Sequence, residues 1–403
     1  MRITAQEPAL RTVYADLHLH IGRTSRGEPV KISGSRDLTF RNIAHEASNR
    51  KGIGLLGVID AHSPGVQRDI ADLLERGEMT EIAGGGVRYK DTTLVLGAEI
   101  EVRDEGMASP AHYLVYMPDF EAMRALTRWL ERHMRNVQLS SQRLYATGRV
   151  LQEVTAERSG LFVPAHLFTP HRSLLGSSSR RIADALDPER IDAVELGLSA
   201  DTAMAEQLPE LRRYPYLTNS DAHSLAKIGR EYNALRLAEA SFEELRLALR
   251  GERGRGIAAN YGLDPRLGKY HRTRCMRCGT EAGAADQRCA ACGSAKLVRG
   301  VAERIAELAA SAGPAAKPDG AGRARPPYVH QVPLEFVPGV GPRMLDRLLE
   351  RFGTEMAILH DVSEAQLLEA AGPRVGELIA LARSGGLRLH AGGGGVYGSV
   401  ARE

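Results

Sequence analysis

The sequence has no apolar run long enough to cross a membrane, and its first residues, MRITAQEPAL, lack the apolar stretch of a secretory signal. We therefore expect a cytoplasmic protein without membrane contact. The formal net charge is also small, +3 over 403 residues, so overall charge does not indicate a nucleic-acid partner. A chain of this length exceeds what one hydrophobic core usually serves, which predicts two or three domains.

Cysteine is scarce, and its four copies lie in one short stretch, at Cys275, Cys278, Cys289 and Cys292. Two Cys-x2-Cys pairs are typical of a zinc site rather than of disulfides in a cytoplasmic protein. Gly279 and Gly293 follow the second cysteine of each pair and suit the tight turn of a zinc knuckle. Four thiolates leave no open coordination position, so this Zn²⁺ is predicted to be structural.

Basic residues are concentrated around these cysteines. Residues 265–300 contain eight Lys and Arg against two acidic residues. A basic patch on one small module is the expected footprint of phosphate contact, although a solvated face beside a zinc site would also produce it. We predict DNA contacts in this module, with Arg274 and Arg277 as candidates.

Residues 1 to about 250 alternate short apolar runs with amphipathic stretches of helical spacing. The runs are residues 13–18, 55–60, 94–100, 113–117, 161–166, 191–197 and 216–223. The clearest helical stretches are Leu38–Ser48, Glu121–His133 and Phe242–Leu249. This alternation predicts an α/β fold with a largely parallel sheet, and seven runs favour a barrel over an open sheet.

Nearly every run ends at or beside a His, Asp or Glu. His18 and His20 stand at i and i+2, so a strand places both imidazoles on one face. The other candidate ligands are His62, Glu99, His112, His166, Asp221 and His223. Because the C-terminal ends of parallel strands meet at one edge, we expect these side chains to converge on metal. Imidazole with carboxylate suits Zn²⁺, Mn²⁺ or iron better than Ca²⁺.

Four further acidic residues, Asp16, Asp60, Glu101 and Glu195, lie close to the candidate ligands in the sequence. They are candidates for hydrogen bonds that orient the imidazoles. They are equally candidates for ordinary caps and ion pairs.

The arrangement resembles the polymerase and histidinol phosphatase (PHP) superfamily over roughly residues 12–235. His18 and His20 match its first motif, His62 its second, Glu99 and His112 the following ligands, His166 its third motif, and Asp221 and His223 its last. The resemblance implies a distorted (β/α)7 barrel that holds up to three metals. Many members place an Asp or His shortly after the first motif, where this chain has Ser25 and Arg26. We therefore expect two or three divalent metals, Zn²⁺ with Mn²⁺ or Mg²⁺ as alternatives.

The C-terminal part of the chain adds two segments. Residues 311–327, rich in Ala, Gly and Pro, predict a flexible linker. The segment 336–342 precedes a predicted helix at Arg343–Phe352, an order that matches a helix-hairpin-helix element. In such an element Gly339 and Gly341 let backbone amides approach a DNA phosphate. A weaker second copy precedes Arg374–Ala382; an ordinary helix connection is the alternative.

The four parts together are similar to the endonuclease Q family of DNA-repair enzymes. The parts are a PHP barrel (1–265), a four-cysteine zinc module (266–310), a linker (311–330) and a helical helix-hairpin-helix-like domain (331–403). The most specific stretches are residues 164–179, 194–211, 217–233 and 332–345.

The resemblance implies a metal-dependent endodeoxyribonuclease that nicks damaged DNA. The implied cut lies 5′ of deaminated bases (uracil, hypoxanthine, xanthine) and of abasic sites, and leaves a 3′-hydroxyl and a 5′-phosphate. The implied catalytic residues are His18, His20, Glu99 and Asp221. Candidates on nearby loops for holding phosphate or reading the base are Arg26, Lys31, His171, Arg172, Ser177 and Lys227.

Two other functions are compatible with the barrel. A PHP-type phosphatase acting on a small phosphomonoester is the main alternative, but the basic module and the C-terminal domain would then have no task. A degenerate DNA-binding scaffold is the third interpretation, and the eight retained candidates argue against it. The sequence leaves a processivity-clamp partner and the oligomeric state open, with a monomer as the default expectation.

Overall fold

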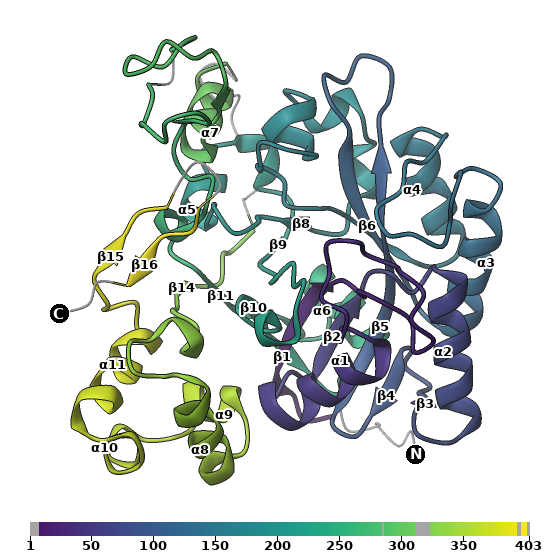
Figure 1. Ribbon diagram of the computed structural model, residues 1–403. Helices are drawn as coiled ribbons and strands as arrows, with labels where there is room; N and C mark the ends of the chain where they lie inside the picture. Colours follow the sequence, from purple (N-terminus) through teal and green to yellow (C-terminus); the bar gives the residue numbers. More distant parts are fainter. Residues whose placement is uncertain (1–7, 284–285, 312–322, 393–395, 401–403) are drawn as a thin grey trace.

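The computed structural model describes residues 8–283, 286–311, 323–392 and 396–400. A strand-rich body holds the N-terminal part of the chain, and the cysteine module and a group of short helices lie along one side of it (Figure 1). Within these ranges, no helix has both the length and the apolar character needed to cross a membrane.

Each of the seven predicted apolar runs contains a strand. The strands are β1 (Arg11–Leu19), β2 (Leu55–Val58), β5 (Thr92–Val102), β6 (Ala111–Met117), β7 (Leu161–Pro164), β8 (Val194–Glu195) and β9 (Tyr216–Leu217). These strands follow one another around a ring. Between β7 and β8, and between β9 and β1, isolated backbone hydrogen bonds take the place of regular strand pairing. Examples are Asp192 N–H to Phe162 O at 3.0 Å and His20 N–H to Ala222 O at 3.2 Å. The fold is therefore the PHP-type α/β fold in an irregular, distorted form.

The sheet is mixed, whereas the sequence led us to expect a largely parallel one. β1–β2, β2–β5 and β8–β9 are parallel, but β5–β6 and β6–β7 are antiparallel. Only residues 103–110 join β5 to β6, a connection too short for the crossover that parallel neighbours need. The sequence analysis assumed that a helix follows every apolar run. No helix lies between β5 and β6, so these two strands pair antiparallel.

Further strands extend the sheet at both ends. On the β1 side lie β10 (Tyr232–Leu237), β11 (Gly256–Gly262) and β14 (Tyr328–His330), and beyond β5 lie β4 (Val87–Tyr89) and β3 (Thr80–Glu81). β14 pairs parallel with β11, so the prediction of a linker up to residue 330 is wrong at its end. Residues 312–322 of that linker lie outside the described residues.

Helices cover the outside of the barrel (Figure 1). They are α1 (Phe40–Glu46), α2 (Pro64–Glu75), α3 (Phe120–Leu130), α4 (Gly148–Glu157), α5 (Thr202–Ala205) and α6 (Phe242–Arg250). Side-chain caps define where several of them begin: Asp119 accepts the Ala122 N–H of α3 at 2.7 Å, and Ser241 accepts the Glu244 N–H of α6 at 3.3 Å. All three predicted helical stretches are helices.

β1 shows how the local sequence positions the site. Val13, Ala15 and Leu17 point to one face of the strand and are buried in an apolar cluster. His18 and His20 stand at the alternate positions, so the period-2 geometry of the strand puts both on the opposite face. Strand alternation thus separates the core from the candidate ligands.

The C-terminal parts are small and partly helical. The cysteine module contains β12 (Arg274–Cys275) and β13 (Leu297–Val298) and is followed by α7 (Val301–Ser311). The last part contains α8 (Pro342–Phe352), α9 (Glu355–His360), α10 (Glu364–Ala371), α11 (Pro373–Arg383), β15 (Leu389–His390) and β16 (Ser399–Val400). Its helices lie beside the β1 edge of the barrel, and its final strand pair returns toward the cysteine module (Figure 1).

Candidate metal centre

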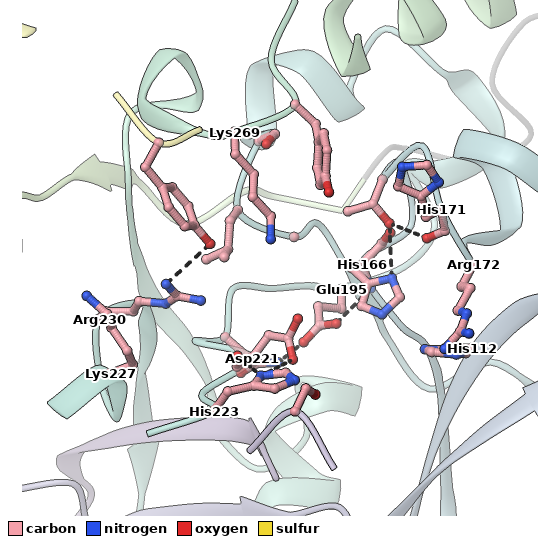
Figure 2. A pocket seen from close by; sticks show the side chains of 18 of the residues that line it. His112, His166, His171, Arg172, Glu195, Asp221, His223, Lys227, Arg230 and Lys269 are labelled. Carbon is pink, nitrogen blue, oxygen red and sulfur yellow. Dashed lines mark hydrogen bonds and ion pairs between the residues drawn. The ribbon is translucent and has the colours of Figure 1, made fainter. Parts of the chain in front are cut away.

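The eight predicted ligands come from strands β1, β5 and β6 and from the segments that follow β1, β2, β7 and β9. Five of them are buried (His18, His20, His62, Glu99 and His112) and three are half-buried (His166, Asp221 and His223). Figure 2 shows His112, His166, Asp221 and His223 around one cavity.

The first group consists of His18, His20 and Asp221, whose ligand atoms all lie within 4.8 Å of one another. Asp221 Oδ1 is 3.6 Å from His18 Nε2 and 3.5 Å from His20 Nε2. Metal bonds of about 2.0–2.1 Å in a tetrahedral site place neighbouring ligand atoms about 3.3 Å apart. His18 Nε2 is buried and has no hydrogen-bond partner in the part of the chain that the structure describes. The group therefore has the spacing and the free lone pair that a divalent transition metal requires.

The second group consists of Glu99, His112 and His166. Glu99 Oε1 lies 2.8 Å from His112 Nδ1 and 3.3 Å from His166 Nε2. The same carboxylate faces the first group, because its Oε1 is 3.5 Å from His18 Nε2 and its Oε2 is 3.6 Å from His20 Nε2. Glu99 thus lies between the two groups, where its carboxylate would be within reach of a metal held by either one.

His62 and His223 lie outside both groups. The His223 ring is 4.7 Å from the His20 ring, and its Nδ1 is 3.6 Å from Asp221 Oδ1. His62 is fully buried, and neither of its ring nitrogens has a hydrogen-bond partner among the described residues. Unpartnered buried nitrogens are costly, which suits a ligand for a further metal. The role of both residues as ligands stays a prediction.

Two candidate ligands have backbone conformations that are rare for residues with a side chain. The angle φ is +28° at His166 and +47° at Asp221. Such conformations cost about 1–3 kcal/mol each and persist only where the surrounding structure imposes them. Gly197 packs against His166 so closely that a Cβ there would lie 3.0 Å from His166 Cβ. Backbone strain of this kind is typical of binding sites, where it positions a side chain at a cost in stability.

Carboxylates behind the two β1 histidines orient their rings. His18 Nδ1 donates to Glu195 at 2.9 Å, and His20 Nδ1 donates to Asp60 at 3.1 Å. Because each bond keeps the proton on Nδ1, Nε2 is left free to face the cavity. These two acidic residues therefore orient imidazoles, one of the two roles that the sequence allowed.

The other two acidic candidates act differently. Glu101 Oε2 lies 3.7 Å from His112 Nε2, a long ion-pair contact. Asp16 makes no hydrogen bond to an imidazole among the described residues; it accepts the N–H of Ser220 at 3.0 Å and of Gly229 at 2.9 Å. Asp16 thus holds the segment that carries Asp221.

Replacing Glu195 with glutamine is expected to weaken metal binding about 10- to 100-fold, the usual cost of losing a partner behind a ligand. Glu195 accepts from three donors: His18 Nδ1, the Asn219 side-chain amide at 2.8 Å and the His166 N–H at 2.7 Å. A glutamine would turn an NH₂ group toward one of them. Competition with a chelating dye measures the affinity, and Glu189→Gln, on the surface, is the matched control. Unchanged metal affinity would contradict the orienting role.

At Glu99 and His20, electrostatics favour the protonation state that binds metal. At His18 and His112, the carboxylates beside them raise the pKa against the effect of burial. Burial alone would raise the pKa of Glu99, but His112 and Lys31 hold it well below its usual value. Burial and Lys31 lower the pKa of His20 to about 4, against the opposing effect of Asp60. A deprotonated carboxylate and a neutral imidazole are the forms that bind metal.

The departure from the PHP pattern at Ser25 and Arg26 has a structural reason. Ser25 donates to Asp69 through both its N–H at 2.7 Å and its Oγ at 2.6 Å. Arg26 is mostly exposed and lies 3.5 Å from Asp72. Both side chains are therefore occupied by acidic residues of α2 rather than by the candidate ligands.

Lys31 brings a cation next to the candidate ligands. Its Nζ lies 3.3 Å from Glu99 Oε2 and 2.7 Å from Ser141 Oγ, and its side chain is only 15% exposed. The sequence analysis named Lys31 as a phosphate or base contact. In the structure it is an ion-pair partner of the candidate bridging carboxylate.

Four of the candidate ligands, His112, His166, Asp221 and His223, line the floor of a pocket of about 560 Å³, within the range of about 300–1,000 Å³ typical of small-molecule sites. Figure 2 shows Lys269 on the opposite side of this pocket from Asp221, with Arg230 and Lys227 beside them. Sequence reasoning missed Arg230, Lys269, Tyr270 and Tyr397, which also line the pocket. Lys269 and Tyr270 lie within the basic stretch, but no sequence signal linked Tyr397 to the barrel.

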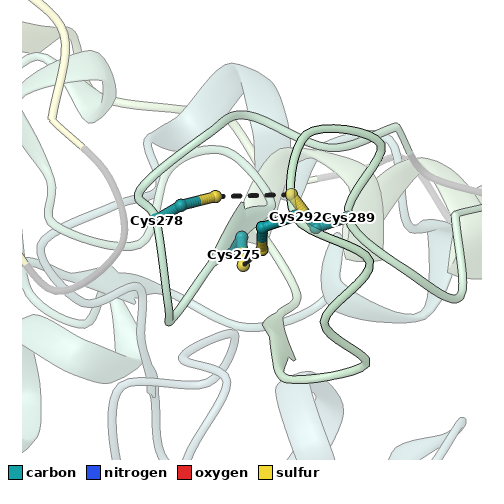
Figure 3. Close-up of side chains that lie close together, drawn as sticks. All are labelled: Cys275, Cys278, Cys289 and Cys292. Carbon is teal, nitrogen blue, oxygen red and sulfur yellow. Dashed lines mark hydrogen bonds between the residues drawn. The ribbon is translucent and has the colours of Figure 1, made fainter.

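The four cysteines converge as predicted (Figure 3). The Sγ atoms of Cys275 and Cys292 are 3.6 Å apart and those of Cys278 and Cys289 are 3.4 Å apart, too far for disulfides. Tetrahedral Zn²⁺ with bonds of about 2.3 Å separates its sulfurs by about 3.8 Å. The glycines after each pair, Gly279 and Gly293, have φ of +73° and +69°. Both turns thus have the predicted knuckle conformation, and the four thiols fit Zn²⁺.

Comparisons with known proteins extend over the whole chain. The family described as PHP-associated matches residues 201–253. Uncharacterized protein YqxK of Bacillus subtilis (strain 168) is 50% identical over 392 residues, which cover 97% of this chain and 100% of that protein. The crystal structure of the lesion-specific endonuclease PfuEndoQ from Pyrococcus furiosus matches with a TM-score of 0.82 and 31% identity, covering 97% of this chain and 95% of that chain.

A second crystal structure holds endonuclease Q in complex with a 27-mer duplex substrate that has an abasic lesion at the active site. It matches with a TM-score of 0.82 and 32% identity, covering 98% of this chain and 97% of that chain. The chain belongs to the endonuclease Q family of the PHP superfamily.

In this member of the endonuclease Q family, the predicted loop contacts divide into two sets. His171, Arg172 and Lys227 line the pocket. Arg26 and Ser177 are not among the pocket residues: Arg26 faces α2, and Ser177 accepts a hydrogen bond from Ser109 at 2.9 Å. Their contact with phosphate or base stays a prediction, because the place of a loop residue in the sequence does not fix the direction of its side chain.

The remaining DNA-contact candidates of this endonuclease Q family member lie outside the barrel. Gly339 has φ of +91°, and Gly341 directly precedes α8, as a helix-hairpin-helix element requires. A Cβ at Gly339 would lie 2.8 Å from a side-chain atom of Val375, at the start of α11, so the two predicted copies pack together. Arg277 is exposed on the cysteine module and Arg274 is half-buried. Their contact with DNA stays a prediction.

Proposed function

We propose that the protein is a metal-dependent DNA-repair endonuclease that nicks the phosphodiester bond 5′ of deaminated bases and abasic sites. The nick would leave a 3′-hydroxyl and a 5′-phosphate. The observation that carries the proposal is a pair of three-residue ligand groups joined by Glu99, in a chain that is similar over nearly its full length to endonuclease Q.

Each group would hold one divalent metal. His18, His20 and Asp221 would hold the first, and Glu99, His112 and His166 the second. Bound metals would supply Lewis acidity, which activates water for attack and neutralises charge on the phosphate. Zn²⁺ is the expected ion from the donor set, with Mn²⁺ or Mg²⁺ as alternatives.

The chain's own residues would position the substrate. Arg172, Lys227, Arg230 and Lys269 around the pocket would attract and orient the phosphates on either side of the cut. Asp221, one-third exposed at the pocket floor, would orient the attacking water. A damaged nucleotide would leave the base stack and enter the pocket, a step that costs least where base pairing is already weak.

The proposal is tested on end-labelled duplexes that each carry one uracil, hypoxanthine or abasic site, beside an undamaged duplex. The expected result is a single cut 5′ of each lesion, none in undamaged DNA, and loss of cutting when a chelator is added. A parallel reaction with p-nitrophenyl phosphate and histidinol phosphate tests the phosphatase alternative. Turnover of these esters without any nicking would overturn the endonuclease proposal.

A further inference from the structure

The pocket is built from two different parts of the chain. Its floor, which carries Asp221 and His223, belongs to the barrel. Segments outside the barrel supply a second wall: Lys269 and Tyr270, at the start of the cysteine module, and Tyr397, near the C-terminal end of the sequence. The eight candidate ligands all belong to the barrel, so metal binding does not account for the residues of this wall.

Backbone contacts hold Tyr397 in place. On either side of it, Gly392 N–H donates to Arg266 O at 2.7 Å and Gly398 N–H donates to Leu267 O at 2.9 Å. The pairing of β15 with β16 closes this segment on itself. A Cβ at Gly398 would lie 2.3 Å from His390 O, so this position requires glycine. The C-terminal segment is thus anchored to residues 266–268, and Tyr397 reaches the pocket from there.

The two tyrosines share the same cation. Lys269 Nζ lies 5.3 Å from the centre of the Tyr270 ring and 5.5 Å from the centre of the Tyr397 ring. Arg230 donates from Nη1 to the Tyr397 hydroxyl at 3.4 Å. The wall therefore combines two aromatic rings with two positive charges. Rings that stack on bases, interleaved with cations that bind phosphate, are the usual means of holding an unpaired nucleotide.

We propose that Tyr397 and Tyr270 hold the base of the damaged nucleotide by stacking, while the cations beside them hold its phosphates. The proposal rests on the proposed function. It adds the residues on which cutting at lesions that still carry a base depends. An abasic site has no base to stack, so it gains nothing from either ring. Cutting at uracil should therefore depend on both tyrosines more strongly than cutting at an abasic site.

The test compares single-turnover cutting of two duplexes with the same flanking sequence, one with uracil and one with an abasic site. Tyr397→Ala is expected to lower the uracil-to-abasic rate ratio about 5- to 150-fold, because stacking one base on one ring is worth about 1–3 kcal/mol. Tyr397→Phe keeps the ring and should retain a ratio close to that of the wild type. Tyr145→Ala removes an exposed tyrosine outside the pocket and is the matched control.

Tyr270→Ala is a second variant, and it should lower the same ratio even if Tyr397→Ala folds poorly. A purely structural role would lower both rates together, so an unchanged ratio in both alanine variants would overturn the inference. A uracil-to-abasic rate ratio as low in Tyr397→Phe as in Tyr397→Ala would also overturn the inference, since the hydroxyl rather than the ring would then matter. If the wild-type protein cuts neither lesion, the proposed function fails and the inference fails with it.

Discussion

Replacing Asp221 with alanine is expected to lower lesion-dependent nicking at least about 10³-fold, the scale seen when a group acting directly at the reacting atoms is removed. Asp221 Oδ1 lies 3.6 Å from His18 Nε2 and 3.5 Å from His20 Nε2, so the variant removes a candidate ligand that the first group shares. His18→Ala and His20→Ala should have effects of the same size. DNA affinity should change little, because the proposed phosphate contacts lie on other residues.

Single-turnover nicking and fluorescence anisotropy of a labelled duplex measure the two quantities separately. Metal content by mass spectrometry should fall in the Asp221 variant. Asp91→Ala, in an exposed turn before β5, removes a carboxylate without touching the site and should behave as the wild type. Nicking by Asp221→Ala at the wild-type rate would show that the chemistry lies elsewhere.

Replacing Cys275 with serine is expected to remove one Zn²⁺ per chain and to unfold the cysteine module. Zinc binding contributes about 10–16 kcal/mol to the folding of small zinc modules at pH 7, so such modules do not persist without the ion. The module has eight Lys and Arg against two acidic residues, and the basic residues are candidates for phosphate contacts. Because unfolding would remove those contacts, DNA affinity should fall about tenfold, which corresponds to roughly 1.4 kcal/mol of binding free energy.

Unfolding of the cysteine module should also destabilise the barrel, because α7 connects the two. Arg304 of this helix donates to the carbonyl oxygens of Leu175 at 2.8 Å and Ser179 at 2.9 Å, in the loop that follows His166. We therefore expect a lower melting temperature for the Cys275 variant. Met276→Ser alters the exposed neighbouring residue and should leave zinc content, melting temperature and affinity unchanged. If Cys275→Ser matched this control, the structural-zinc assignment would be wrong.

Sequence reasoning located the strands well and their directions less well. All seven apolar runs contain a strand, because alternation and β-branched residues act locally. The antiparallel pairing of β5 with β6 and the placement of β14 against β11 were missed. Pairing partners are set by connection length and by packing between distant segments, neither of which a single run reveals.

The candidate ligands were found for a different reason. Metal binding requires particular residue types, and the ends of neighbouring strands bring them to one place, so the sequence could predict that the eight candidates converge. Only the structure groups His18, His20 and Asp221. The loop residues did not follow this rule. Arg26 turns to Asp72 and Ser177 to Ser109, because a loop side chain chooses the nearest partner in three dimensions.

By itself the sequence predicted the α/β class, the candidate ligands and the four-thiol site, since each depends on residue type and spacing along the chain. Only the tertiary structure decided which groups share a pocket. It placed Tyr397 in the same pocket as Asp221, although 175 residues lie between them in the chain. Contact between such distant positions depends on how the C-terminal segment packs against residues 266–268, and packing of this kind has no local pattern in the sequence.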